Sequence, residues 1–148
     1  MSSNRQETSE AIQAKLKDAR VARLATLDAT LGPHLVPVCF VYDGNMFYTA
    51  IDRKPKRVAP ERLARLRNIA SAPQVALLID DYDEDWTQLW YILVRGKAKQ
   101  IPKSAHKERA RAIRKLRAKY PQYAGRMLAH DAPIVRIIPD RITAWGKL

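Results

Sequence analysis

The stretch of sequence that decides the fold is HLVPVCFVYDGNMFYTAI, residues 34–51. Residues 34–42 place apolar side chains on both faces of the segment, which predicts a strand in the middle of a sheet. Asp43-Gly44 is a tight hairpin signal, so Met46 to Ile51 is predicted to be the returning strand. Val21 to Leu27 precedes a turn-rich segment and forms a third strand, so the three together predict a meander.

The rest of the chain predicts more strands and a few helices. Strands are expected at three apolar segments, 75–79, 89–101 and 134–138, and Gly96 marks a bulge or a close approach in the second. Helices are expected at 7–19, at 60–72 and, capped by Ser104, up to Tyr120. Short hairpins without strand–helix–strand alternation favour an antiparallel barrel or sandwich of five or six strands. The 148 residues (1–148) are expected to form one domain.

The formal charge of +12 is the strongest compositional signal. Segment 53–67 holds seven Lys or Arg residues against one Glu, and segment 103–119 holds eight against one Glu. Such an excess favours anionic partners: nucleic acid, an anionic membrane face, or a phosphorylated or polycarboxylate small molecule. Because there is one cysteine, Cys39, no signal-peptide core and no apolar run near the roughly 20 residues of a membrane span, a cytoplasmic location is expected.

Several kinds of chemistry are missing from the sequence. There is no phosphate-binding glycine loop, dinucleotide-type glycine cluster or hydrolase nucleophile elbow. One cysteine and three dispersed histidines do not form a zinc motif. The acidic run 80–85 imitates the start of a calcium loop but has Trp86 and Ile92 where that loop needs Gly and Glu. No metal site is predicted, and no side chain is identified as a catalytic acid or base.

The segment YTAIDRKPKR, residues 48–57, is the candidate anion site. A strand end with a hydroxyl is followed by cations and a helix N-terminus, and phosphate binding needs such converging donors. A basic helix edge that only keeps the surface soluble explains the segment equally well. On the neighbouring strand, Pro37 either frees backbone groups for the edge of a flat ring or simply marks a bulge. Four aromatic residues could wall a planar ligand or, more commonly, form a dimer interface: Trp86, Trp90, Tyr91 and Trp145.

Several segments follow one another in a characteristic order: ARLATL (22–27), GPHLVPV (32–38), YTA with its basic turn (48–57), LRNI (66–69), PQVALL (73–78) and RGKA (95–98). Together they resemble the pyridoxamine-phosphate-oxidase-like split barrel superfamily. Within it, DDY and DW in 80–86 and KYPQY in 119–123 resemble a small subgroup of deazaflavin-dependent enzymes. The resemblance covers nearly the whole chain and depends on order and spacing rather than on one motif.

The resemblance implies a mainly β (α+β) fold, a six-stranded antiparallel split β-barrel with flanking helices, and a homodimer with two cofactor sites at its interface. The cofactor-binding residues would be Val36, Pro37 and Val38 at the ring, through their backbone, and Thr49, Ala50, Lys54, Lys56 and Arg57 at the phosphate. Tyr91 falls where the phosphate-oxidase branch has a glutamine that reaches the flavin from the other subunit. The subgroup and the cationic stretches favour coenzyme F420, with its oligoglutamate tail, over FMN. The pyridoxal-phosphate-binding C-terminus of true phosphate oxidases is absent, which argues against vitamin B6 oxidation.

The function expected from this resemblance is that of an oxidoreductase that uses F420 or FMN for hydride transfer to an unidentified small organic substrate. Two alternatives stay open. One is a non-catalytic carrier or sensor of the same flavin or deazaflavin. The other is a nucleic-acid-binding module built on the basic helix 103–119, although that helix lacks the interleaved aromatic residues that stack on bases.

Overall fold

The structure is a computed structural model that describes residues 9–52 and 60–148. Its strands are β1 (Ala22–Asp28), β2 (Gly32–Val38), β3 (Val41–Tyr42), β4 (Phe47–Ala50), β5 (Gln74–Asp81), β6 (Trp90–Gln100) and β7 (Ile134–Gly146). Its helices are α1 (Glu10–Asp18), α2 (Pro60–Ser71), the short 3-10 helix η1 (Trp86–Gln88), α3 (His106–Lys119) and α4 (Pro121–Ala124). The positions 54, 56 and 57, predicted to hold a phosphate, lie outside the described residues.

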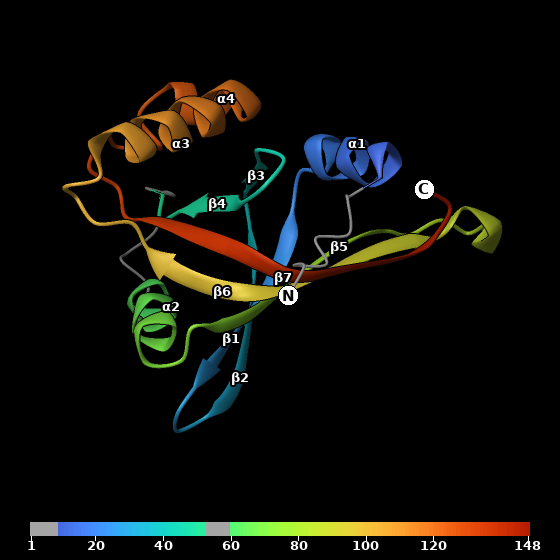
Figure 1. Cartoon of the computed structure of the whole chain (residues 1–148), viewed down its shortest axis with the longest axis horizontal. Coiled ribbons are helices and arrows are strands. Elements are labelled where there is room, and N and C mark those ends of the chain that lie inside the picture. Colours follow the sequence, from blue (N-terminus) through green and yellow to red (C-terminus); the bar gives the residue numbers. More distant parts are fainter. Residues whose placement is uncertain (1–8, 53–59) are drawn as a thin grey trace, which may run out of the picture.

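The strands form one antiparallel sheet in the order β2-β1-β5-β6-β7-β4-β3. This confirms the mainly β, antiparallel split-barrel prediction, with one strand more than the six expected. In Figure 1 the sheet is strongly curled, α3 and α4 lie together on one side of β6 and β7, and α2 lies on the other. The β5–β6 hairpin and the end of β7 extend past α1 and away from α2, α3 and α4 as an arm, with η1 at its tip.

The extra strand arises because the segment 34–42 breaks at Cys39 and Phe40. At the break, the Phe40 amide donates to the Tyr120 hydroxyl (3.0 Å), and the Lys119 ammonium donates to the Phe40 carbonyl (3.0 Å). Side chains at the end of α3 therefore satisfy backbone groups that a continuous ladder would otherwise pair. The prediction of a central strand here was wrong, since β2 and β3 are the two edges of the sheet.

The alternating faces of the hairpin strands enter two hydrophobic clusters. Tyr42 and Phe47 belong to a cluster that also holds Leu16 of α1 and Ile69 of α2. Tyr48 belongs to a second cluster, covered by α3 and α4. Because both faces of β4 are buried, its four residues are held firmly on both sides.

The predicted hairpin turn and the predicted bulge are present, and one predicted helix cap is not. Gly44 has φ of 96°, and the Asp43 carboxylate accepts from the amides of Asn45 and Met46 (2.8 and 2.7 Å), which closes the predicted hairpin. A bulge lies at Arg95/Gly96, as predicted. The prediction that Ser104 caps α3 was wrong, because the cap residue is Ala105 and no side chain caps the helix. No helix in the described residues is long and apolar enough to span a membrane.

Candidate functional site

The ends of β2 and β4 meet at a small cavity beside α2. Its lining residues come from the C-terminal end of β2 and the break, from the end of β4 and from α2: Pro37, Val38, Cys39, Ala50, Ile51, Asp52 and Arg65. The cavity volume is about 50 Å³, which holds a water or two and no flavin ring. A flavin ring placed against these described residues would therefore extend beyond the cavity.

The three predicted ring-binding residues occupy alternate faces of β2. Val38 is buried and Val36 is packed against the core, whereas Pro37 is exposed on the opposite face. β2 is an edge strand with β1 on one side, and no described strand pairs with its other edge. Its outer edge can therefore offer backbone groups to a ligand, which is the manner of contact expected for these residues. That they contact a ring stays a prediction.

The predicted phosphate residues Thr49 and Ala50 lie on β4 and are both buried. Ala50 lines the cavity. The Thr49 hydroxyl donates to the Cys39 carbonyl at 2.7 Å, so its single proton is used inside the protein. To donate to a phosphate, this hydroxyl would have to turn away from Cys39. Its role in phosphate binding stays a prediction.

Asp52, which lines the cavity, forms a buried pair with Tyr123 that sequence reasoning missed. The Tyr123 hydroxyl donates to the Asp52 carboxylate, and the two residues are 4% and 8% exposed respectively. Burial, followed by the hydrogen bond to Asp52, raises the pKa of the Tyr123 hydroxyl well above its ordinary value. The phenol is thus held protonated as a donor, and it ties the end of β4 to α4. Asp52 directly follows the predicted strand, but nothing local in the sequence signals its burial.

Tyr91 does not line the cavity. It lies on β6, where its ring stacks on that of Trp145 with centroids 5.7 Å apart and an angle of 21° between the planes. The registers β2–β1, β1–β5 and β5–β6 place Pro37, Arg23, Leu78 and Leu93 on one face of the sheet, and Tyr91 is two residues from Leu93 on that same face.

This face, the open sheet face, carries five large apolar side chains that are exposed. They are Leu27 (45%), Leu35 (66%), Leu78 (36%), Tyr91 (40%) and Trp145 (53%). The same face also carries the Arg23–Asp80 ion pair (2.9 Å), so charge interrupts its apolar residues. Exposed apolar surface bordered by polar groups is typical of interaction surfaces. Of the four aromatic residues predicted to wall a ligand or an interface, Trp90 is instead buried in the core, with the Lys15 ammonium 4.9 Å from its ring centroid.

The basic helix α3 uses part of its charge inside the protein. Arg109 is buried and donates to the carbonyls of His130 and Ala132 (3.1 and 3.0 Å). Arg117 donates to the Leu128 carbonyl at 3.0 Å, and Lys119 to that of Phe40. These three cations hold the fold together, so the exposed basic face of the helix is narrower than its sequence suggests.

Within residues 9–52 and 60–148, no group of three or more His, Cys, Asp or Glu side chains could hold a metal ion. The cavity offers an edge strand, an arginine and a carboxylate already engaged by a tyrosine. Such an arrangement suits binding and orienting a flat ligand rather than performing acid–base chemistry by itself.

Comparisons with known proteins agree with this architecture. A reductase of 5a,11a-dehydrotetracycline and 5a,11a-dehydrooxytetracycline from Streptomyces rimosus is 30% identical over 128 residues, which is 84% of this chain and 72% of that protein. The heme storage protein HutZ from Vibrio cholerae has a similar fold, with a TM-score of 0.70, 16% identity and 95% of each chain covered. An FAD-binding protein from Mesorhizobium loti has a TM-score of 0.65 at 19% identity, with 92% of this chain and 93% of that chain covered.

The sequence model of the pyridoxamine 5'-phosphate oxidase family matches residues 8–146. This match spans nearly the whole chain and includes every described strand. The chain therefore belongs to the pyridoxamine 5'-phosphate oxidase family.

Proposed function

We propose that this protein is an oxidoreductase that binds coenzyme F420, or alternatively FMN, and uses it to reduce a small organic substrate. The observation that carries this function is the cavity where the outer edge of β2 meets the end of β4. Asp52 lines that cavity, and the chain continues from it directly into the cationic segment 53–57. In this proposal the ring of the cofactor contacts the cavity, and its anionic tail contacts the cationic segment that follows Asp52 in the sequence. Family membership and the reductase from Streptomyces rimosus support an oxidoreductase in general.

In this proposal each group has a binding or positioning role. The backbone of Val36, Pro37 and Val38 borders the ring. Thr49, Lys54, Lys56 and Arg57 hold the phosphate beside Ala50, because cations and hydroxyls are the donors that phosphate binds best. When bound, the cofactor supplies hydride transfer, and the protein orients it and excludes water. The Asp52–Tyr123 pair acts as a positioning element that fixes the end of β4, where the phosphate-binding segment begins.

We further propose that the protein works as a homodimer through the open sheet face. The cavity of one chain is too small to enclose a ring, so a second surface is needed. The open sheet face carries Pro37 at one end and the Tyr91–Trp145 stack at the other. Two copies packed through this face would bring Tyr91 of one chain toward the cavity of the other. We retain the prediction that the protein is located in the cytoplasm.

Absorbance titration of the purified protein with F420 and, separately, with FMN tests this function. The variant Lys54→Gln/Lys56→Gln/Arg57→Gln is expected to weaken binding by about 100-fold, because each lost charged hydrogen bond to phosphate costs on the order of 1 kcal/mol. The matched control is Lys107→Gln/Arg114→Gln/Lys115→Gln, which removes the same charge from exposed positions of α3. This control is expected to bind like the parent.

Turnover assays and DNA retention distinguish the two alternatives from the proposed function. Tight cofactor binding with no turnover on any acceptor would assign a carrier or sensor instead of an enzyme. Strongly salt-dependent DNA retention that the α3 variant abolishes, without affinity for either cofactor, would assign a nucleic-acid-binding module. Absence of binding to both cofactors would overturn the proposed function.

A further inference from the structure

A second, larger cavity also borders α2. It has a volume of about 510 Å³ and opens between α2 and the β6–β7 ladder. None of its lining residues is among those that line the cavity at Pro37. Arg65 of α2 borders the smaller cavity, whereas Leu66, Ile69 and Ala70 border the larger one. We call this second cavity the α2 groove, and its size is that of an ordinary small-molecule site.

The apolar part of the α2 groove is contributed by both walls. Leu66, Ile69, Ala70 and Pro73 come from α2 and the turn after it, and Ile138 comes from β7. Ile138 is 43% exposed, although it follows a run of buried residues in β7. Exposed apolar surface inside a concave site is surface that a ligand can remove from water.

The walls of the groove are fixed by hydrogen bonds, so the groove is preformed. The buried Asn68 side chain donates to the Thr26 hydroxyl at 3.1 Å and ties α2 to β1. Beyond the helix, the Ala98 amide of β6 donates to the Pro73 carbonyl at 2.8 Å. At the bulge, a Cβ on Gly96 would collide with the Ile138 carbonyl, so the glycine lets the two strands come together beneath the groove. A preformed site avoids the ordering cost of assembling one.

The charge of the groove is positive. Lys97 and Lys99 line it, and no acidic residue does so among the described residues. The β6–β7 register pairs Lys97 with Ile138 and Lys99 with Arg136, so the two lysines and Arg136 share one face of the ladder. Neither lysine has an ion pair within the part of the chain that the structure describes.

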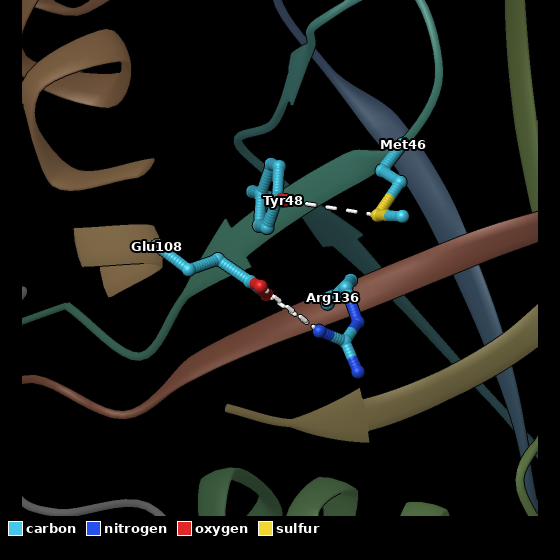
Figure 2. Close-up of polar contacts among 4 residues, drawn as sticks. All are labelled: Met46, Tyr48, Glu108 and Arg136. Atoms are coloured by element: carbon cyan, nitrogen blue, oxygen red, sulfur yellow. Dashed lines mark hydrogen bonds and ion pairs between the residues drawn. The ribbon is translucent and has the colours of Figure 1, made fainter. Parts of the chain in front are cut away.

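Arg136 contributes its guanidinium, a hydrogen-bond donor, to the lining of the α2 groove. Its Nη1 contacts both carboxylate oxygens of Glu108 on α3 (2.6 and 3.0 Å). Figure 2 shows this ion pair, with the second terminal nitrogen of the guanidinium pointing away from Glu108. The Nε atom of Arg136 is buried and has no hydrogen-bond partner among the described residues. A buried donor without an acceptor is costly, and an anionic group bound in the groove would supply that acceptor.

From this combination we propose that the α2 groove binds a small amphipathic carboxylate, with its apolar body on Ile69, Ala70 and Ile138 and its anionic group at Lys97, Lys99 and Arg136. An apolar floor alone would accept a neutral ligand, and a cluster of cations alone would accept inorganic anions. Apolar side chains of α2 and β7 and cations of β6 and β7 line one preformed cavity, which selects a molecule that has both parts. This site is separate from the proposed cofactor site and does not depend on it.

Octanoate is a suitable probe and 1-octanol its neutral counterpart. In ¹H–¹⁵N correlation spectra of the full chain, octanoate is expected to shift the amide signals of Ala70, Ala98 and Gln100 saturably. The dissociation constant should be on the order of 1 mM or tighter, given the ligand's few heavy atoms. Octanol is expected to bind about tenfold more weakly or not at all. Spectra recorded with the cofactor candidates present and absent should give the same result.

Two variants test the two halves of the site separately. Ala70→Trp at an exposed position of α2 fills the groove and should abolish the octanoate shifts. Lys97→Gln/Lys99→Gln should weaken octanoate binding about tenfold and leave octanol unchanged. The matched control, Lys17→Gln/Lys147→Gln, removes the same charge from exposed positions of α1 and the C-terminus and should bind octanoate like the parent.

Several results would overturn the proposal. These are equal affinity for octanoate and octanol, shifts that map away from the groove, and no saturation by about 10 mM. Unchanged binding in a folded Ala70→Trp variant would also contradict it. If that variant does not fold, as judged by its spectrum, the lysine variant and its control still decide the result. Signals of Ala70 and Ala98 that change with protein concentration alone would instead assign the groove to a second copy of the chain.

Discussion

The Tyr123 hydroxyl on α4 donates a hydrogen bond to the Asp52 carboxylate at the end of β4, and both side chains are buried. The two residues are 71 positions apart in the chain, so this contact joins the C-terminal helices to the strand that leads into the cationic segment. Because the pKa of Tyr123 is raised by burial and by this carboxylate, the phenol stays a donor throughout the physiological range. The pair is therefore a fixed anchor for the cofactor candidate site.

The variant Tyr123→Phe is expected to lower the free energy of unfolding by about 1–3 kcal/mol, because it removes a hydrogen bond to a buried carboxylate. The proposed cofactor affinity should fall with it, since Asp52 positions the start of the phosphate-binding segment. Urea unfolding and cofactor titration measure the two effects. Tyr82→Phe is the control, since Tyr82 is 64% exposed. Equal stability of the two variants would show that the buried pair does not stabilise the strand end.

The variant Thr49→Val separates two roles of one hydroxyl. It removes the 2.7 Å bond to the Cys39 carbonyl and should lower the free energy of unfolding by about 1 kcal/mol. If the hydroxyl also serves the phosphate, as proposed, affinity for F420 or FMN should fall about fivefold. Thr49→Ser keeps the hydroxyl and should preserve affinity. Loss of stability without loss of affinity would leave Thr49 with a structural role alone.

Features that depend on neighbours in sequence were predictable, and those that depend on distant residues were not. The Asp43-Gly44 hairpin follows from local turn chemistry, and the period-two pattern located the strands around it. The break at Phe40 depends on Tyr120, 80 residues away, and nothing in the apolar run signals it. The burial of Asp52 likewise involves a distant residue, Tyr123. The α2 groove requires the packing of α2 on the β6–β7 ladder, which periodicity alone does not specify.

The variant Gly96→Ala is expected to be strongly destabilising. An added Cβ would collide with the Ile138 carbonyl oxygen across the ladder, and that neighbour is backbone rather than a flexible side chain. Overpacking of this kind costs about 1–3 kcal/mol or more. Gly125→Ala is the control, because its Cβ would meet the Gln122 carbonyl oxygen at an ordinary contact distance of 3.6 Å. Equal urea midpoints for the two variants would contradict the close approach of β6 and β7.

The lowered pKa of Lys119 is expected to make the free energy of unfolding depend on pH. Burial first, and the charge of Arg20 second, lower the pKa of its ammonium from 10.5 to about 8. Between these values the unfolded chain binds more protons than the folded one, so the contribution of this group to stability rises as the pH rises. Relative to Lys119→Met, the parent should gain stability between about pH 7 and about pH 9.5, as measured by urea unfolding at both values.

Lys115→Met is the control for that measurement, because Lys115 is exposed on the same helix. The stability difference between the parent and this variant should stay constant over the same pH interval. A difference between the parent and Lys119→Met that also stays constant would mean that Lys119 keeps its ordinary pKa in the folded protein.

The open sheet face makes a prediction about assembly. Leu35 is 66% exposed and lies opposite Ala25 on the same face as Leu78 and Tyr91. Burying an aspartate there in an apolar interface would cost several kcal/mol unless it finds a partner. Leu35→Asp and Leu78→Asp are therefore expected to convert a dimer into monomers in sedimentation velocity, and to weaken binding of the proposed cofactor as the second wall of the site is lost.

Leu31→Asp is the control that distinguishes an interface from general surface chemistry. Leu31 is the most exposed of the large apolar residues described, at 85%, and it lies in the turn between β1 and β2 rather than on the open sheet face. The same substitution there changes charge and hydrophobicity equally and should leave the dimer intact. If all three variants sediment alike, the open sheet face is not the contact between subunits, and the cavity at Pro37 must be covered by another surface.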